Sequence, residues 1–73
     1  MPKLGTFSGA EVCAILAAEG FRQVRQRGSH VVMQRQGSSG SITVPVPDHR
    51  EIRIGTLQAI IRQSGVPRER FMR

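Results

Sequence analysis

Hydrophobic residues recur at helical spacing in two stretches of the chain, one near each end. In the first stretch, Val12 and Leu16 lie on one face of a helix. Ser8 precedes them and Glu11 follows three residues later, the pattern of a capping box in which each side chain bonds the other residue's backbone N–H. This pattern predicts a first helix over about residues 9–19.

Glycine is predicted to end both helices, because it adopts the left-handed conformation without steric cost. Gly20 ends the first helix. The second helix has Thr56 as its expected N-cap and ends at Gly65, just before Pro67. Its hydrophobic stripe consists of Leu57, Ile60 and Ile61. Residues 68–71 are expected to add one more turn.

Three extended segments lie between the two helices. They cover residues 21–27, 30–35 and 41–46, and two short glycine-containing turns separate them. The last segment alternates cleanly between hydrophobic and polar residues. Its hydrophobic face consists of Ile42, Val44 and Val46. The sequence therefore predicts a three-stranded antiparallel meander.

The order helix, strand, strand, strand, helix predicts an α+β fold. Both helices are amphipathic, so we expect both to cover the same face of the sheet and to leave the other face open to solvent. This α-β-β-β-α arrangement is that of the double-stranded-RNA-binding domain, although a fold alone does not assign a function. The chain has 73 residues, no repeat and no linker, so residues 1–73 are expected to form a single domain.

The charge of the chain favours a polyanionic partner. Eleven Lys and Arg residues oppose five Asp and Glu residues, the formal net charge is +6, and every cation except Lys3 is an arginine. Arginine binds phosphate through paired hydrogen bonds, so nucleic acid is the first expectation and an acidic protein the second. The lone cysteine, Cys13, in a short chain without a signal peptide indicates a cytoplasmic protein. No apolar run is long enough to span a membrane.

The acidic residues are scattered, which bears on the type of nuclease to expect. A two-metal nuclease needs clustered carboxylates, and the sequence has no evident cluster of this kind, so we expect neither a metal ion nor a cofactor. RNA can be cleaved without a metal, because its own 2′-hydroxyl attacks the adjacent phosphate. The protein then has to move protons and stabilise charge. Histidine moves protons near neutral pH, and the chain has His30 and His49.

His30 is the stronger catalytic candidate. It follows the turn formed by Gly28 and Ser29, where glycine lets an RNA backbone approach closely. Arginines on both sides of it are expected to hold phosphate groups. The residues expected to contact RNA are Arg25, Arg27, Gly28, Ser29, Arg35 and His49, with Arg22 as a further candidate.

Strand alternation predicts which side chains accompany His30. One face of its strand carries His30, Val32 and Gln34. The other face carries Val31, Met33 and Arg35. We expect the face with His30 to be exposed and the face with Met33 to contact the helices. From the residues alone, a surface histidine without a catalytic role stays open as an alternative.

Beyond single residues, nearly the whole chain resembles the HicA (YcfA-like) family of mRNA interferase toxins. Arg-Gly-Ser-His at residues 27–30 resembles the family's glycine–serine–histidine signature. Residues 44–49 (Val-Pro-Val-Pro-Asp-His) and 51–57 resemble its later motifs, and the opening segment 8–12 and closing helix fit as well. One departure is Ile54, where we expect Lys or Pro; it concerns the loop and not catalysis.

The resemblance implies a fold like that of the double-stranded-RNA-binding domain and an enzyme that cleaves mRNA independently of translation. The family's catalytic histidine falls on His30. A HicB-type antitoxin protein is the implied partner that neutralises the toxin.

Three other residues have simpler explanations than chemistry. His49 lies in a proline-rich loop beside Asp48, and we favour a structural role over an RNA contact or a second proton transfer. Thr56 could offer backbone amides to a phosphate, but a plain N-cap is simpler. Cys13 is expected to be a small buried hydrophobic residue.

Two alternatives to the toxin nuclease stay open. A non-catalytic double-stranded-RNA-binding domain would share the fold, but such domains use lysines at the start of the last helix and none occurs there. The second alternative is an interaction module whose basic face serves only an acidic protein.

Overall fold

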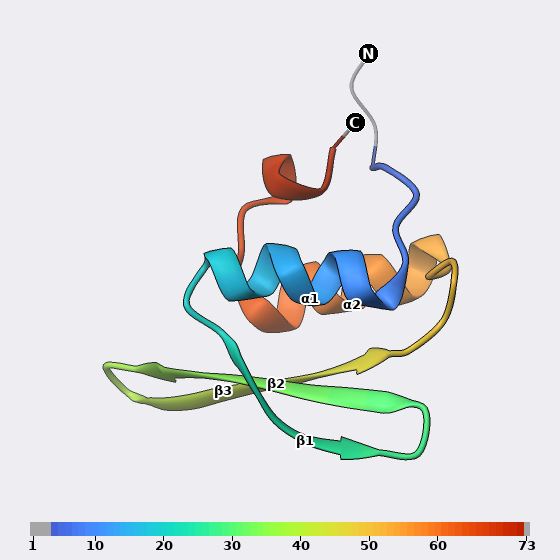
Figure 1. Cartoon of the computed structure of the whole chain (residues 1–73). Coiled ribbons are helices and arrows are strands. Elements are labelled where there is room, and N and C mark those ends of the chain that lie inside the picture. Colours follow the sequence, from blue (N-terminus) through green and yellow to red (C-terminus); the bar gives the residue numbers. More distant parts are fainter. Residues whose placement is uncertain (1–3, 73) are drawn as a thin grey trace.

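The computed structural model describes residues 4–72, which fold as two helices on one face of a three-stranded antiparallel sheet (Figure 1). The elements are α1 (Gly9–Ala18), β1 (Arg22–Arg27), β2 (His30–Gly37), β3 (Gly40–Pro47), α2 (Ile54–Ser64) and the short 3-10 helix η1 (Arg68–Phe71). The strands lie in the order β1-β2-β3, and each antiparallel neighbour is also the next strand along the chain. The predicted α-β-β-β-α fold is confirmed, including the final turn at residues 68–71.

Both ends of α1 are as the sequence predicts. The Ser8 Oγ accepts the Glu11 backbone N–H at 3.1 Å, and the Ser8 N–H donates to the Glu11 carboxylate at 2.9 Å. At the other end Gly20 has φ +95°. The Phe21 N–H donates to the Leu16 carbonyl at 3.0 Å, the long bond of a Schellman motif. This reversal turns Phe21, which is 3% exposed, into the core.

The start of α2 differs from the prediction. The helix begins at Ile54 with Arg53 as its N-cap, so the expected N-cap Thr56 is wrong and lies inside the first turn. The cause is the preceding Ile52, which is 5% exposed and donates its N–H to the Phe7 carbonyl at 2.8 Å. Burying an isoleucine contributes about 1.5–3 kcal/mol, which outweighs the ~1 kcal/mol of a side-chain cap.

The core lies between the covered sheet face and the helices. Its sheet residues are Met33, Val44 and Val46, and its helix residues are Val12, Leu16, Leu57 and Ile60. Phe71 of η1 is fully buried and meets Phe7 edge to face, with ring centroids 6.0 Å apart. The N-terminal and C-terminal segments therefore pack together over the helices.

β1 contains a β-bulge at Val24, which allows Phe21 and Arg25 to lie on opposite faces of the sheet. Gln23 pairs with Met33 and Arg25 pairs with Val32, so two steps along β1 match one step along β2 and Val24 has no partner. In an unbroken strand Phe21 and Arg25 would share a face, because they are four residues apart. The extra residue lets Phe21 enter the core while Arg25 lies on the opposite, open face.

The loop after β3 is tied down at two points. The Asp48 N–H donates to the Ser29 carbonyl at 2.6 Å, and the Gly9 N–H donates to the His49 carbonyl at 2.8 Å. A Cβ at Gly9 would clash with the Pro47 carbonyl oxygen, so the close approach requires glycine. These contacts connect the loop, the β1–β2 turn and the start of α1.

Candidate active site on the open sheet face

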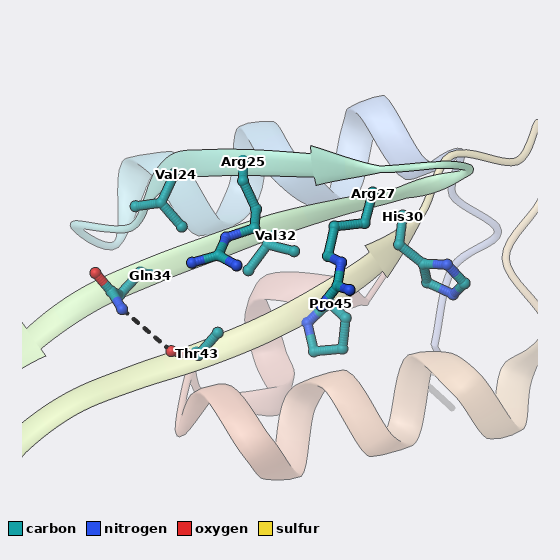
Figure 2. Close-up of a pocket in the computed structure, with 8 residues that line it drawn as sticks. All are labelled: Val24, Arg25, Arg27, His30, Val32, Gln34, Thr43 and Pro45. Atoms are coloured by element: carbon teal, nitrogen blue, oxygen red, sulfur yellow. Dashed lines mark hydrogen bonds between the residues drawn. The ribbon is translucent and has the colours of Figure 1, made fainter.

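The sheet face opposite the helices holds a shallow hollow of about 520 Å³. Figure 2 shows the side chains that line it, all from the three strands. They are Val24, Arg25, Arg27, His30, Val32, Gln34, Thr43 and Pro45. Three of the residues expected to act together, His30, Arg25 and Arg27, are thus brought to one site.

His30 is placed at one end of the hollow by a tight hairpin. It pairs with Arg27 across the two-residue turn of Gly28 and Ser29. Gly28 has φ +58° while Ser29 has no positive φ, the combination of a type II′ turn that requires glycine at its first central position. The Ser29 carbonyl accepts the Asp48 N–H and is therefore occupied. Gly28 and Ser29 shape the turn, and the exposed imidazole of His30 is accessible from solvent.

Arg25 and Arg27 supply positive charge along the hollow. Each lies opposite an open-face residue of β2, Val32 and His30 respectively. In Figure 2 their guanidinium groups lie between His30 and the far end of the hollow. Neither forms an ion pair with a carboxylate within residues 4–72, so their charge is available to an anion.

Gln34 and Thr43 close the far end of the hollow. They are partners across β2 and β3, and the Gln34 Nε2 donates to the Thr43 Oγ1 at 3.3 Å. Strand alternation predicts Gln34 on the open face, but no sequence pattern gives either residue a function. Only the β2–β3 register reveals that they meet, and this register depends on a turn of four small residues, Gly37 to Gly40.

Arg35 does not line the hollow and lies on the face opposite His30, as strand alternation predicts, and its contact with RNA stays a prediction. Its guanidinium donates to the Glu19 carbonyl at 3.3 Å and lies 5.1 Å from the centre of the Phe21 ring. A cation at the negative end of a helix dipole is favourable, and so is a cation over an aromatic ring. Arg35 therefore stabilises the end of α1 on the covered side of the sheet.

Arg22 and His49 lie outside the lining of the hollow. Arg22 pairs with Gln34, so it projects from the open face next to the hollow. His49 is exposed in the loop after β3, and its backbone carbonyl accepts the Gly9 N–H. The contact of its side chain with RNA and the structural role that the sequence favours both stay predictions.

The thiol of Cys13 is only half-buried, and it lies away from the hollow. Burial raises the pKa of Cys13, and the negative charge of Asp48 raises it further. A thiol held protonated is a poor nucleophile. The residue is thus a packing residue at the edge of the core.

Residues 4–72 contain no group of three His, Cys, Asp or Glu side chains arranged to hold a metal ion. Over the same residues, no helix has both the length and the apolar character needed to cross a membrane.

Comparison with known proteins finds one family model that matches most of the chain. The family model described as the HicA toxin of bacterial toxin-antitoxin matches residues 9–66, from the first residue of α1 to just beyond α2. No curated protein and no solved structure matches the chain significantly. The matched range includes every residue that lines the hollow.

Proposed function

The protein belongs to the HicA toxin family of bacterial toxin–antitoxin systems, and from this premise we propose that it is an endoribonuclease that cleaves mRNA, with His30 as its catalytic residue. The observation that carries the proposal is the hollow that places His30 beside Arg25 and Arg27 on an uncovered face. An exposed imidazole beside cations that lack an anionic partner suits the cleavage of a phosphodiester.

The reaction needs no atom that the RNA and water do not supply. The 2′-hydroxyl oxygen bonds to the adjacent phosphorus, and the bond from phosphorus to the 5′ oxygen of the next nucleotide breaks. The products are a 2′,3′-cyclic phosphate and a 5′-hydroxyl. One proton leaves the 2′-hydroxyl and one reaches the departing 5′ oxygen, and His30 is the hollow-lining residue whose ring can both accept and donate a proton. Arg25 and Arg27 stabilise the charge that grows on the phosphate oxygens.

A pair of histidine variants tests the assignment. We expect His30→Ala to lower cleavage of a long RNA in EDTA by at least about a hundredfold, the usual contribution of an acid–base group. His49→Ala is the matched control, because it removes a histidine that lies outside the hollow. The cyclic phosphate end is detected on the wild-type products, and circular dichroism checks that both variants are folded.

Growth after induction gives a second measure of the same role. His30→Ala should relieve the growth arrest that the wild-type toxin causes. A fully toxic His30→Ala protein would remove this residue from the mechanism. Wild-type protein that binds RNA but never cleaves it would favour the non-catalytic RNA-binding alternative.

The family implies an antitoxin partner, and we propose that this partner is of the HicB type and covers the open face with His30. The exposed arginines of β1 attract an acidic inhibitor, and opposite charge speeds its association. Hydrogen exchange of the free and bound toxin tests this model. Protection is expected over the hollow and β1, whereas protection confined to the helices would contradict it.

A further inference from the structure

We infer that the hollow is a subsite for one unpaired RNA base, with the phosphates on Arg25 and Arg27 and the base edge against Gln34 and Thr43. This inference rests on the proposed function and deepens it, since it names the form of RNA that the site takes. It starts from the length of the hollow. His30 and Gln34 are four residues apart on one strand, which is about 13 Å. A single phosphate at His30 does not reach the far end, whereas a nucleotide with its base is long enough to span the distance.

The floor of the hollow is apolar although it lies on an exposed surface. Val24, Val32 and Pro45 contribute to it, and Val24 is one of two large hydrophobic residues among residues 4–72 that are conspicuously exposed. Phosphate contacts alone do not require an apolar floor, because phosphates bind charged and polar groups. A flat, weakly hydrated base does fit such a surface.

The aromatic residues cannot provide the usual platform for a base. The chain has three phenylalanines and no Trp or Tyr, and all three rings are at most 3% exposed in the core. Guanidinium planes are the other group on which proteins stack unpaired bases. Arg25 and Arg27 project over the same floor (Figure 2), so a base can lie between aliphatic side chains and a guanidinium plane.

The far end supplies hydrogen-bonding groups for the edge of the base. The Gln34 amide offers a donor and an acceptor, and the Thr43 hydroxyl offers both as well. Their mutual bond of 3.3 Å is long for a side-chain hydrogen bond, so a base can replace it at little cost. In a duplex the base edges are paired and the faces are stacked, which keeps a base out of the hollow.

Binding by the uncleaving His30→Ala protein tests the subsite directly. The probes are a twelve-nucleotide RNA, the same RNA annealed to its complement, and a series in which one base at a time is replaced by an abasic site. We expect the single strand to bind at least about tenfold more tightly than the duplex at equal salt. One abasic position should weaken binding by about tenfold, the typical effect of losing one stacked base, with every phosphate retained. Equal or tighter binding of the duplex, or a flat abasic series, would overturn the inference.

A matched pair of glutamine variants tests the base edge. Gln34→Met removes the amide inside the hollow, whereas Gln36→Met makes the same change two residues along the same face, outside the hollow. In the His30→Ala background, the ratio of affinities for the best and worst base at the sensitive position should fall by about fivefold or more for Gln34→Met. Gln36→Met should leave that ratio unchanged. Equal ratios for the two variants would contradict the role of Gln34.

These outcomes separate the inference from the proposed function. The binding probes carry 2′-O-methyl sugars, which block the attacking 2′-hydroxyl, so the binding result stands even if His30 is not the catalyst. Conversely, wild-type protein that cleaves RNA while the abasic series is flat retains the nuclease and loses the base subsite.

Discussion

Successive residues of β2 point to opposite faces of the sheet, and the side chains on the two faces have different contacts. On the covered face Met33 is 3% exposed and packs in the core between the sheet and the helices. On the open face its neighbours Val32 and Gln34 line the hollow. The same alternation sends Arg35 back to the covered side, where it contacts the end of α1.

The role of a charged side chain in β2 and its neighbours depends more on the face of the sheet that it occupies than on its distance from His30 in sequence. Arg27 and Arg35 are both within five residues of His30. Only Arg27 pairs with it and lines the hollow. A basic residue near a catalytic candidate therefore counts toward the site only after its face is known.

Deleting Val24 should have the largest effect on stability, because it removes the β-bulge that places Phe21 and Arg25 on opposite faces of the sheet. Without the extra residue, Phe21 cannot occupy the core while Arg27 pairs with His30. Expelling a phenylalanine from a core costs about 3–5 kcal/mol, much of the stability of a small domain. Val24→Ala keeps the residue count and should cost less than about 1 kcal/mol, because the side chain is 39% exposed. Urea denaturation measures the free energy of unfolding of both variants. A deletion variant as stable as Val24→Ala would show that the bulge is dispensable.

Truncating neighbours on opposite faces of β2 should give the next largest contrast. Met33→Ala is expected to lower the free energy of unfolding by about 2–4 kcal/mol through the cavity that it leaves. Val32→Ala should cost less than about 1 kcal/mol and should instead weaken the binding of single-stranded RNA. The comparison uses denaturant curves and RNA titrations on both variants. Similar losses of stability would mean that the open face is also part of the core.

Arg35 and Arg25 should show opposite responses of intermediate size. Arg35→Ala is expected to lower stability by about 1 kcal/mol, since the guanidinium bonds a helix end and lies over Phe21. Arg25→Ala should leave stability within about 0.5 kcal/mol and reduce the salt slope of RNA binding by about 0.7. With Arg22, Arg25 and Arg27 on the open face, the wild-type slope should be near −2, from about −0.7 per phosphate contact. A shallower salt dependence of RNA binding for Arg35→Ala would show that Arg35 contacts RNA.

The smallest effect concerns Cys13 and alkaline pH. Its pKa is raised in the folded protein by burial and then by Asp48. Above the ordinary thiol pKa, near 8.5, the unfolded chain releases this proton more readily than the folded one. Stability should therefore fall slightly more between pH 7 and pH 9.5 for the wild type than for Cys13→Ser. If stability depends on pH in the same way for the two proteins, folding does not change the pKa of the thiol.

Much of the fold could be predicted because its determinants are local. Capping pairs, helical spacing and turn glycines lie within a few residues of the elements they specify. Alternation from the Gly28 turn also placed His30 on the open face, because a two-residue hairpin leaves little freedom of register.

The features that escaped prediction depend on residues far apart in sequence. The bulge at Val24 has no local pattern, since it follows from the burial of Phe21 against the rest of the core. The start of α2 follows from the bond between Ile52 and Phe7, 45 positions apart, which overrides the local preference for Thr56. The Gln34–Thr43 pair needs the register of two strands. Each of these is a tertiary effect that a pattern along the chain does not contain.

The prolines of β3 also affect how molecules of this toxin meet one another. Backbone N–H groups along a strand point alternately to its two sides. The Asp48 N–H points toward the β1–β2 turn, so the backbone nitrogens of residues 45 and 47 face the other side, which is the outer edge of the sheet. Both positions are prolines and have no N–H to offer. A strand from another molecule that aligned with β3 would find two donors missing. At the other edge, β1 carries three arginines that repel a second copy of itself. The sheet is thereby protected at both edges against growth into aggregates.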